Sequence, residues 1–132
     1  MVNYSDIQRD RRKCLALTGL TFAEFELLLP PFIRSYERLF PADRNSAGRP
    51  RRRAAGGGRK GALHPPEQKL LFILVYLKTY PLQAVMAGLF GISQPRVNYW
   101  IHRLLPALRD ALAELDVLPE RDPSQFPHGR AA

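Results

Sequence analysis

Residues 82–103 read LQAVMAGLFGISQPRVNYWIHR, and this stretch decides the fold. Its apolar residues recur at helical spacing on both sides of the turn 91–93, which predicts two helices joined by a short turn. Ala87 is small enough to let a second helix cross the first, and Gly91, four residues on, tolerates the positive φ that such a turn needs. Ser93 is a good N-cap for the second helix, and Pro95 fits its first turn. The stretch predicts a helix-turn-helix.

The predicted motif has an apolar inner side, formed by both helices and the turn, and a polar outer side on its second helix. The residues expected to point inward are Met86, Phe90, Ile92, Val97, Trp100 and Ile101. The candidate DNA-binding residues of the outer side are Ser93, Gln94, Arg96, Asn98, Tyr99, His102 and Arg103. Amide side chains can hydrogen-bond adenine, and guanidinium groups can hydrogen-bond guanine. The first residues of a recognition helix reach the major groove. The face predicts binding to double-stranded DNA, while an ordinary helical hairpin with a solvated polar face is the simpler alternative.

A basic block precedes this motif. Residues 34–60 hold nine cations against two anions, a net charge of +7 out of +8 for the chain. Residues 41–62, PADRNSAGRPRRRAAGGGRKGA, lack apolar periodicity and are rich in glycine, so we expect a flexible basic loop. Such a cluster favours contact with a polyanion, although a merely solvated loop or an address signal would have the same composition. The candidate DNA-binding cations here are Arg49, Arg51, Arg52, Arg53, Arg59 and Lys60.

The rest of the chain predicts an all-α protein. Residues 5–13 fit a short helix capped by Ser5, and Thr21 with Glu24 forms a capping box for a helix that Pro30-Pro31 should kink or divide. Residues 66–80, 82–90, 94–105 and 106–118 fit four further helices. We expect a helical segment over 1–40, the basic loop over 41–62, the helix-turn-helix domain over 63–118 and a disordered tail over 119–132.

Composition excludes several classes of protein. With 132 residues and 45% hydrophobic residues the chain can bury one core, and its single cysteine, Cys14, excludes a disulfide framework. The N-terminus lacks a signal-peptide pattern and the longest apolar run is far too short to span a bilayer, so we expect a soluble, cytoplasmic protein. The three histidines lack zinc-ligand spacing and GGGRKG lacks the Ser or Thr of a phosphate loop. We expect no metal, no cofactor and no active site.

Three blocks together resemble a known family. LTGLTFAEFELLLPPF, GRPRRRAAGGGRKGAL and EQKLLFILVYLKTYPLQAVMAGLFGISQPRVNYWIHRLLPAL, in this order, are similar to the N-terminal region of bacterial insertion-sequence transposases of the DDE superfamily, insertion-sequence-five type. The resemblance covers roughly residues 14–118. It implies a helix-turn-helix that recognises terminal inverted repeats, with full-length transposase or a second copy as partner, and a bacterial, nucleoid-associated location.

In that family a catalytic domain with three acidic residues and two metal ions follows this region. The chain ends at Ala132 without such carboxylates, so we expect no catalysis by it alone. Either frameshifting joins it to a catalytic domain, or the gene is a remnant. Two other classes remain open. A small transcription regulator would use the same motif and dimerise through residues 106–118, with Leu108, Leu112 and Leu115, unless these pack within the domain. A basic RNA-binding protein would bind structured RNA as well as duplex DNA.

Overall fold

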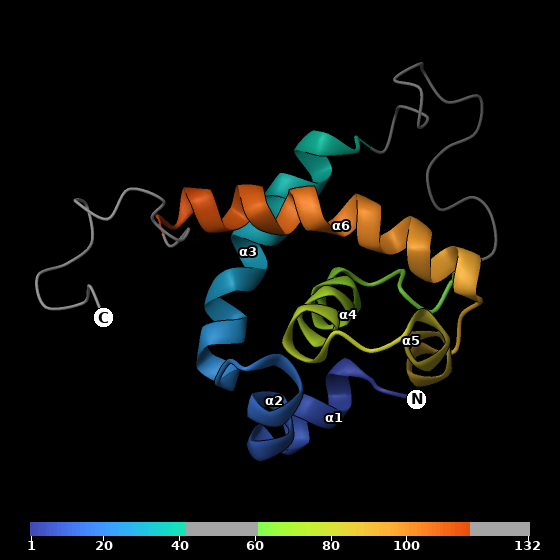
Figure 1. Ribbon diagram of the computed structural model, residues 1–132. Helices are drawn as coiled ribbons and strands as arrows, with labels where there is room; N and C mark the ends of the chain where they lie inside the picture. Colours follow the sequence, from blue (N-terminus) through green and yellow to red (C-terminus); the bar gives the residue numbers. More distant parts are fainter. Residues whose placement is uncertain (42–60, 117–132) are drawn as a thin grey trace, which may run out of the picture.

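The computed structural model describes residues 1–41 and 61–116, which contain six α-helices and no strand (Figure 1). The helices are α1 (Tyr4–Arg9), α2 (Arg11–Thr18), α3 (Phe22–Leu39), α4 (Pro66–Thr79), α5 (Gln83–Phe90) and α6 (Gln94–Glu114). The all-α prediction is confirmed. The predicted basic loop and C-terminal tail lie almost entirely outside the described residues.

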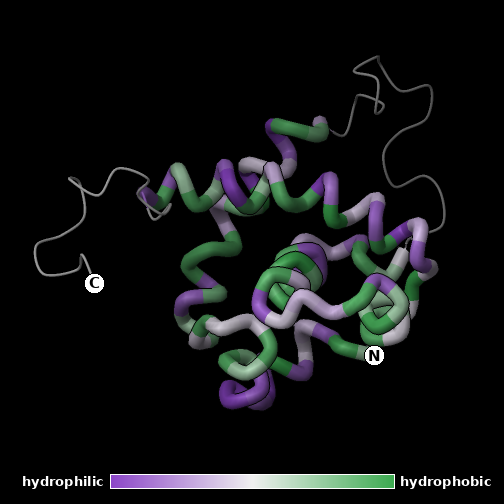
Figure 2. The backbone as a smooth tube through the Cα atoms, in the orientation of Figure 1, coloured by the Kyte–Doolittle hydropathy of each residue, from purple (hydrophilic) through white to green (hydrophobic). Residues whose placement is uncertain are grey.

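Helix α4 is the centre of the fold. Every residue from Gln68 to Val75 is buried, and α1, α2, α3 and α6 all pack against this helix. In Figure 2 the other helices surround α4, whose residues are mostly apolar. A helix with neighbours on all sides has no solvent-facing stripe, which explains why LLFILV at residues 70–75 shows an apolar run rather than helical periodicity.

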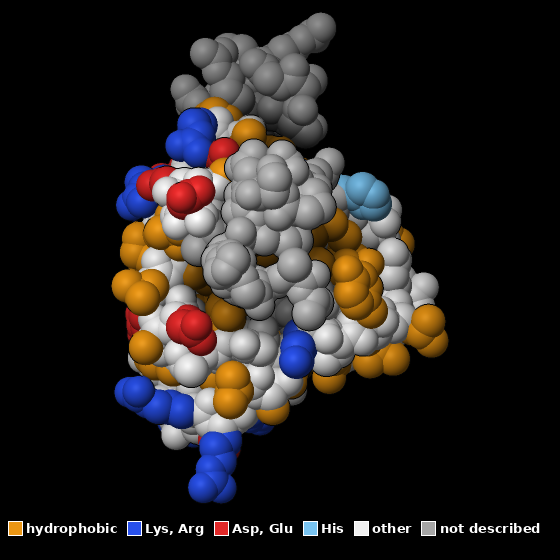
Figure 3. Space-filling view, turned by 60° about the vertical axis from the view of Figure 1, so that its left-hand side comes forward, with side chains coloured by type: hydrophobic (Ala, Val, Ile, Leu, Met, Phe, Trp, Pro, Cys, Tyr) orange, Lys and Arg blue, Asp and Glu red, His pale blue; other side chains and the backbone are white. Residues whose placement is uncertain are grey.

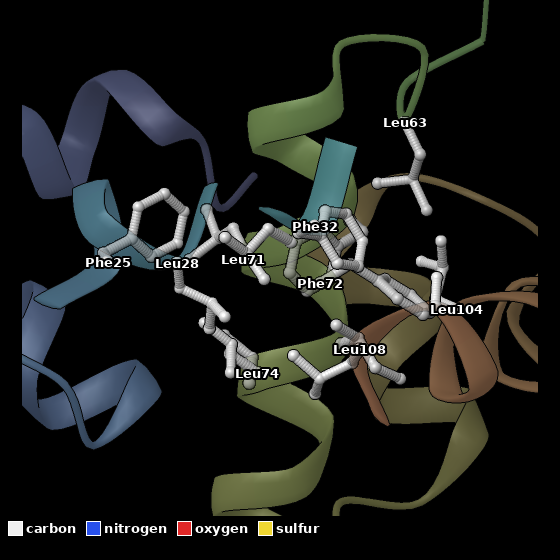
Figure 4. Packing of buried hydrophobic residues seen from close by; sticks show 14 of the residues in the cluster. Phe25, Leu28, Phe32, Leu63, Leu71, Phe72, Leu74, Leu104 and Leu108 are labelled. Carbon is white, nitrogen blue, oxygen red and sulfur yellow. The ribbon is translucent and has the colours of Figure 1, made fainter. Parts of the chain in front are cut away.

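One hydrophobic core joins the helices that precede and follow the basic block. Its labelled members in Figure 4 come from α3, α4, α6 and the segment before α4: Phe25, Leu28, Phe32, Leu63, Leu71, Phe72, Leu74, Leu104 and Leu108. The largest contact between two helices is that of α3 with α6. The first 41 residues therefore share their core with the helix-turn-helix instead of forming a core of their own.

Ion pairs join α3 to the last turns of α6 at the surface. Arg34 pairs with Glu114 at 2.5 Å, and Arg38 pairs with Asp110. Figure 3 looks onto the side from which the C-terminal end of α6 projects, and acidic and basic side chains lie next to each other there. Because these side chains are more than a third exposed, the pairs add little stability and serve mainly to balance charge.

Helix α6 continues through Pro106, so the predicted division into helices 94–105 and 106–118 is wrong. Pro106 offers no N–H to the carbonyl of His102, but both residues are exposed and water can bind that carbonyl. On the opposite side Ala107, Leu108 and Ala111 are buried in the core. Packing against α3 thus outweighs the one lost hydrogen bond and keeps the helix continuous.

The predicted helix 5–13 is also wrong, because residues 4–18 form two helices. The backbone is extended at Asp10 (φ −131°), whose side chain accepts hydrogen bonds from the N–H groups of Arg12 and Lys13. Asp10 therefore ends α1 and caps α2, and α1 starts after Asn3 instead of after Ser5. The preference of aspartate for helix caps explains why the chain divides at Asp10.

Helix α3 begins as predicted, with the Thr21 hydroxyl and the Glu24 carboxylate forming the two halves of a capping box. It continues as one helix through Pro30 and Pro31. Of the two predicted forms, the division into two shorter helices is therefore wrong. No single helix in residues 1–41 and 61–116 is long and apolar enough to cross a membrane; only the pair α2 and α3, bent by 61°, passes by length and composition.

The first residues of the chain brace the helix-turn-helix. The N–H of Val2 donates to the carbonyl of Leu89 in α5 at 2.8 Å. The buried amide of Gln68 accepts from the N–H of Tyr4 at 2.9 Å and donates to the carbonyl of Val2 at 2.6 Å. The side chain of Met1 covers Gly91. The turn between α5 and α6 is thereby held from outside the motif.

Two glycines of this region should respond in opposite ways to alanine. Gly91 has φ +66° and lies under Met1, so Gly91→Ala should lower the free energy of unfolding by about 1–2 kcal/mol. Gly88 lies within α5 with open space at its Cβ position, so Gly88→Ala should raise it by up to about 1 kcal/mol. Urea denaturation followed by circular dichroism measures both changes. Equal effects of the two variants would contradict the assigned turn.

Candidate nucleic-acid interface

The helix-turn-helix consists of α5, the turn 91–93 and α6. Gly91 has φ +66°, the left-handed conformation predicted for it, and the N–H of Ile92 donates to the carbonyl of Ala87 at 3.1 Å. Ser93 caps α6 by accepting a hydrogen bond from the N–H of Arg96. Figure 1 shows α5 nearly end-on with α6 lying across it. The predicted turn and its caps are confirmed.

The inward face of the motif is also as predicted. Met86, Phe90, Val97 and Ile101 are buried, and Ile92, Trp100 and Ala87 are partly buried against the core. Phe90 meets Phe72 of α4 edge-on at 5.0 Å between ring centroids. The motif is therefore anchored to the central helix, which fixes the direction in which the outer face of α6 points.

The outer face of the first three turns of α6 is open to solvent. The exposed residues among the candidates are Ser93, Gln94, Arg96, Asn98, Tyr99 and His102, whereas Arg103 is half-buried. The hydroxyl of Ser93 is already used by its cap. The structure thus brings the seven candidates together: Ser93 caps α6, and the other six lie in its first three turns.

Helical geometry divides this face into two flanks. At about 100° per residue, Gln94 and Asn98 lie roughly 40° apart, and Arg96 and Arg103 roughly 20° apart. The mean directions of the two pairs differ by roughly 170°, with Tyr99 and His102 between them on the exposed side of the helix. The ring Nδ1 of His102 lies 2.9 Å from the carbonyl oxygen of Asn98, which holds the imidazole against the helix. One flank therefore carries amides and the other carries guanidinium groups.

The arginine flank is ordered by aromatic rings. The guanidinium carbon of Arg96 lies 4.7 Å from the ring centroid of Tyr99. The guanidinium carbon of Arg103 lies 4.1 Å from the ring centroid of Phe40, and its Nε donates to the hydroxyl of Tyr36 at 3.0 Å. Tyr36 and Phe40 were predicted only as apolar positions of a helix, because no signal in the sequence linked them to residues more than 60 positions away.

A buried lysine lies beneath the same flank. The Lys69 ammonium donates to the carbonyl of His64 at 2.6 Å and lies 5.2 Å from the ring of Tyr36 and 5.4 Å from that of Trp100. Burial, followed by the positive charge of Arg103, lowers the pKa of Lys69 to about 8, and Glu67 opposes this change. No signal in the sequence pointed to Lys69, which lies at the junction of α3, α4 and α6.

The six candidate cations of the basic block, Arg49, Arg51, Arg52, Arg53, Arg59 and Lys60, lie outside the described residues. Within residues 1–41 and 61–116 no group of three or more His, Cys, Asp or Glu side chains could hold a metal ion. What the described part of the site offers is therefore hydrogen-bond donors, acceptors and positive charge on one exposed helix face.

Comparison with known proteins finds a family with a similar motif. Residues 61–114, which span α4 to the end of α6, match the family model "Helix-turn-helix of DDE superfamily endonuclease". Searches of curated proteins and of solved structures found no match. The segment that carries the exposed face is thus similar to the helix-turn-helix of a family of DNA-processing enzymes, in agreement with the coarse form of the predicted resemblance.

The pKa of Lys69 predicts how stability depends on pH. Between about pH 8 and the ordinary value of 10.5, the unfolded chain holds the Lys69 proton and the folded chain releases it, so raising the pH stabilises the fold. The free energy of unfolding of the wild type relative to Lys69→Met should rise across this window. Urea denaturation at pH 7.5, 9 and 10.5 measures it, with Lys78→Met, an exposed lysine of the same helix, as control. A constant difference would refute the prediction.

Proposed function

We propose that the chain is the DNA-binding part of an insertion-sequence transposase and recognises the terminal inverted repeats of its element. In this proposal it has no catalytic activity alone and acts on the bacterial nucleoid in the cytoplasm. The observation that carries the proposal is the exposed polar face of α6, which starts at a capped N-terminus inside the segment that matches the DDE-superfamily family model. Its partners are double-stranded DNA and either full-length transposase or a second copy.

The proposed mechanism divides the work between base reading and phosphate binding. Gln94, Arg96, Asn98 and Tyr99 lie in the first two turns of α6, the part of a recognition helix that enters the major groove. Amide groups can make bidentate hydrogen bonds to adenine, and Arg96 to guanine. His102 and Arg103, one turn further on, are assigned to the phosphates, which set the register of the helix on the duplex.

The basic block supplies the sequence-independent part of binding in this proposal. Its six candidate cations follow α3 and precede α4 in the sequence, and both helices lie in the same core as α6. Because the block holds nearly all the excess positive charge of the chain, it would run along the phosphate backbone or an adjacent groove as an arm.

The structure does not favour the alternative of a dimeric transcription regulator built on residues 106–118. Leu108 is 3% exposed and belongs to the core, and Leu112 packs against it. Only Leu115 is largely exposed, at 42%. These leucines mainly pack α6 within the domain, as the simpler alternative expected, and they do not provide an apolar face for a second copy.

Recognition by α6 predicts a clear effect of single substitutions. Asn98→Ala and Arg96→Ala should each reduce the preference for an element end by about 1–3 kcal/mol, since each removes one base contact. Arg109→Ala is the matched control: Arg109 is exposed on the same helix but lies about 20 Å along it from Arg96. A gel-shift titration of the purified chain against the DNA flanking its gene, with a scrambled duplex as competitor, measures the preference.

The result that would overturn the proposal is equal binding to the flanking and scrambled duplexes by the wild type. Loss of end preference with Arg109→Ala but not with Asn98→Ala would place the reading face elsewhere. Structured RNA that competes as well as duplex DNA would favour the RNA-binding alternative, because the face proposed here reads the major groove of B-form DNA.

The arm predicts a salt dependence. If six cations of the basic block each displace one counterion, replacing all six (Arg49, Arg51, Arg52, Arg53, Arg59 and Lys60) by alanine should reduce the slope of log K against log salt by about 5. The end preference should change little, because phosphate contacts do not carry sequence information. Titrations at four salt concentrations measure the slope, and an unchanged slope would remove the arm from the proposal.

A further inference from the structure

Arginines and aromatic rings of two helices form a continuous surface beside the recognition face. We define the arginine–aromatic surface as Tyr36, Phe40, Arg96, Tyr99 and Arg103. The first two belong to the end of α3 and the others to α6. Tyr36 and Phe40 lie outside residues 61–114, the segment that the family model covers.

Arg103 is held on several sides. Its guanidinium carbon lies 4.1 Å from the ring centroid of Phe40, 5.5 Å from that of Tyr99 and 5.6 Å from that of Tyr36. Its Nε donates to the hydroxyl of Tyr36 at 3.0 Å. The four N–H groups at the end of the side chain take no part in that bond. The rings therefore set the orientation of a guanidinium group whose four terminal N–H groups donate to no residue within 1–41 and 61–116.

The positive charges of Arg96 and Arg103 are not paired in the way that those of the neighbouring arginines are. Arg34 and Arg38 of α3 each form an ion pair with a carboxylate of α6. Within residues 1–41 and 61–116, neither Arg96 nor Arg103 lies within ion-pair distance of a carboxylate. An aromatic ring attracts a cation without neutralising it, so this surface keeps its full positive charge.

We propose that Arg103 of the arginine–aromatic surface binds the phosphate backbone of duplex DNA, and that Tyr36 and Phe40 act as its positioning residues. This inference rests on the proposed function and adds α3 to the DNA interface. A guanidinium group binds phosphate through two parallel hydrogen bonds, which demands a fixed orientation of its plane. Rings that fix this plane before binding reduce the entropy that is lost on binding.

The position of Arg103 on α6 fits a contact with the phosphate backbone. Arg96 and Arg103 lie on the same side of α6, two turns and about 10 Å apart. The amide flank of Gln94 and Asn98 lies across the ridge from them. In a helix seated in the major groove with Tyr99 and His102 nearest the bases, Arg103 would therefore point toward one wall of the groove, where the phosphates lie.

The test compares duplex affinity in the full chain by fluorescence anisotropy at several salt concentrations. Arg103→Ala should weaken binding about five- to tenfold and reduce the salt slope by about 1, as expected for one phosphate contact. Phe40→Leu should weaken binding about threefold, because the charge remains but its orientation is lost. In the Arg103→Ala background, Phe40→Leu should have no further effect.

Two further variants separate positioning from packing. Tyr36→Phe removes only the hydroxyl that accepts from Arg103, so it should weaken binding about twofold while leaving the helical content by circular dichroism unchanged. Arg11→Ala is the matched control, because Arg11 lies over the ring of Phe22 at 5.4 Å, at the opposite end of α3. It should change affinity and salt slope by no more than the removal of one remote charge does.

Each outcome decides between statements. If Phe40→Leu weakens binding equally in both backgrounds, the ring acts only through packing and the positioning role is overturned. If Asn98→Ala abolishes end preference while Arg103→Ala leaves affinity and slope unchanged, the recognition face stands and the arginine–aromatic surface is refuted. If the wild type shows no preference for the element end, the proposed function fails, whatever the phosphate contacts do.

Discussion

The burial of eight consecutive residues of α4 on every side of the helix governs how the other helices pack. Its run of buried residues, Gln68 to Val75, can leave water only if helices cover every side of it. Helices α1, α2 and α3 cover part of this surface and α6 covers another part. The recognition helix is therefore held by the same apolar burial that stabilises the whole domain, and its outer face points away from that core.

The polar residues inside this packing have specific partners. Gln68 uses its buried amide to bind the first residues of the chain, which in turn hold α5 through Val2. Lys69 lies against the rings of Tyr36 and Trp100 and donates to the carbonyl of His64. A buried group without partners would cost several kcal/mol. Gln68 and Lys69 of α4 thus contact the N-terminus, the segment before α4 and the helix-turn-helix.

Helix α6 serves two purposes along its length. Its last three turns bury Leu104, Leu108 and Ala111 and carry the carboxylates that balance the arginines of α3. Its first three turns project side chains without carboxylates, and their arginines lie against rings instead. The contrast within one helix separates the part that packs the domain from the part that we propose meets DNA. In the proposal, α3 contributes to both.

The sequence by itself determined the local features of this protein. The turn at Gly91, the caps Ser93 and Thr21, the inward residues Val97 and Ile101 and the outer face of α6 all followed from spacing and residue type, because these features depend on neighbours within one or two turns. They account for most of the candidate site. The resemblance to DDE-superfamily transposases likewise came from contiguous blocks, and the family match extends over residues 61–114.

Only the tertiary structure decided the rest. Pro106 does not end α6, because burial of Ala107, Leu108 and Ala111 outweighs the loss of one hydrogen bond to an exposed carbonyl that water can reach. The pairing of Arg103 with Tyr36 and Phe40 joins residues more than 60 positions apart, and no spacing rule connects them. Local chemistry specified where the face lies, and long-range packing decided which of its charges are held in place.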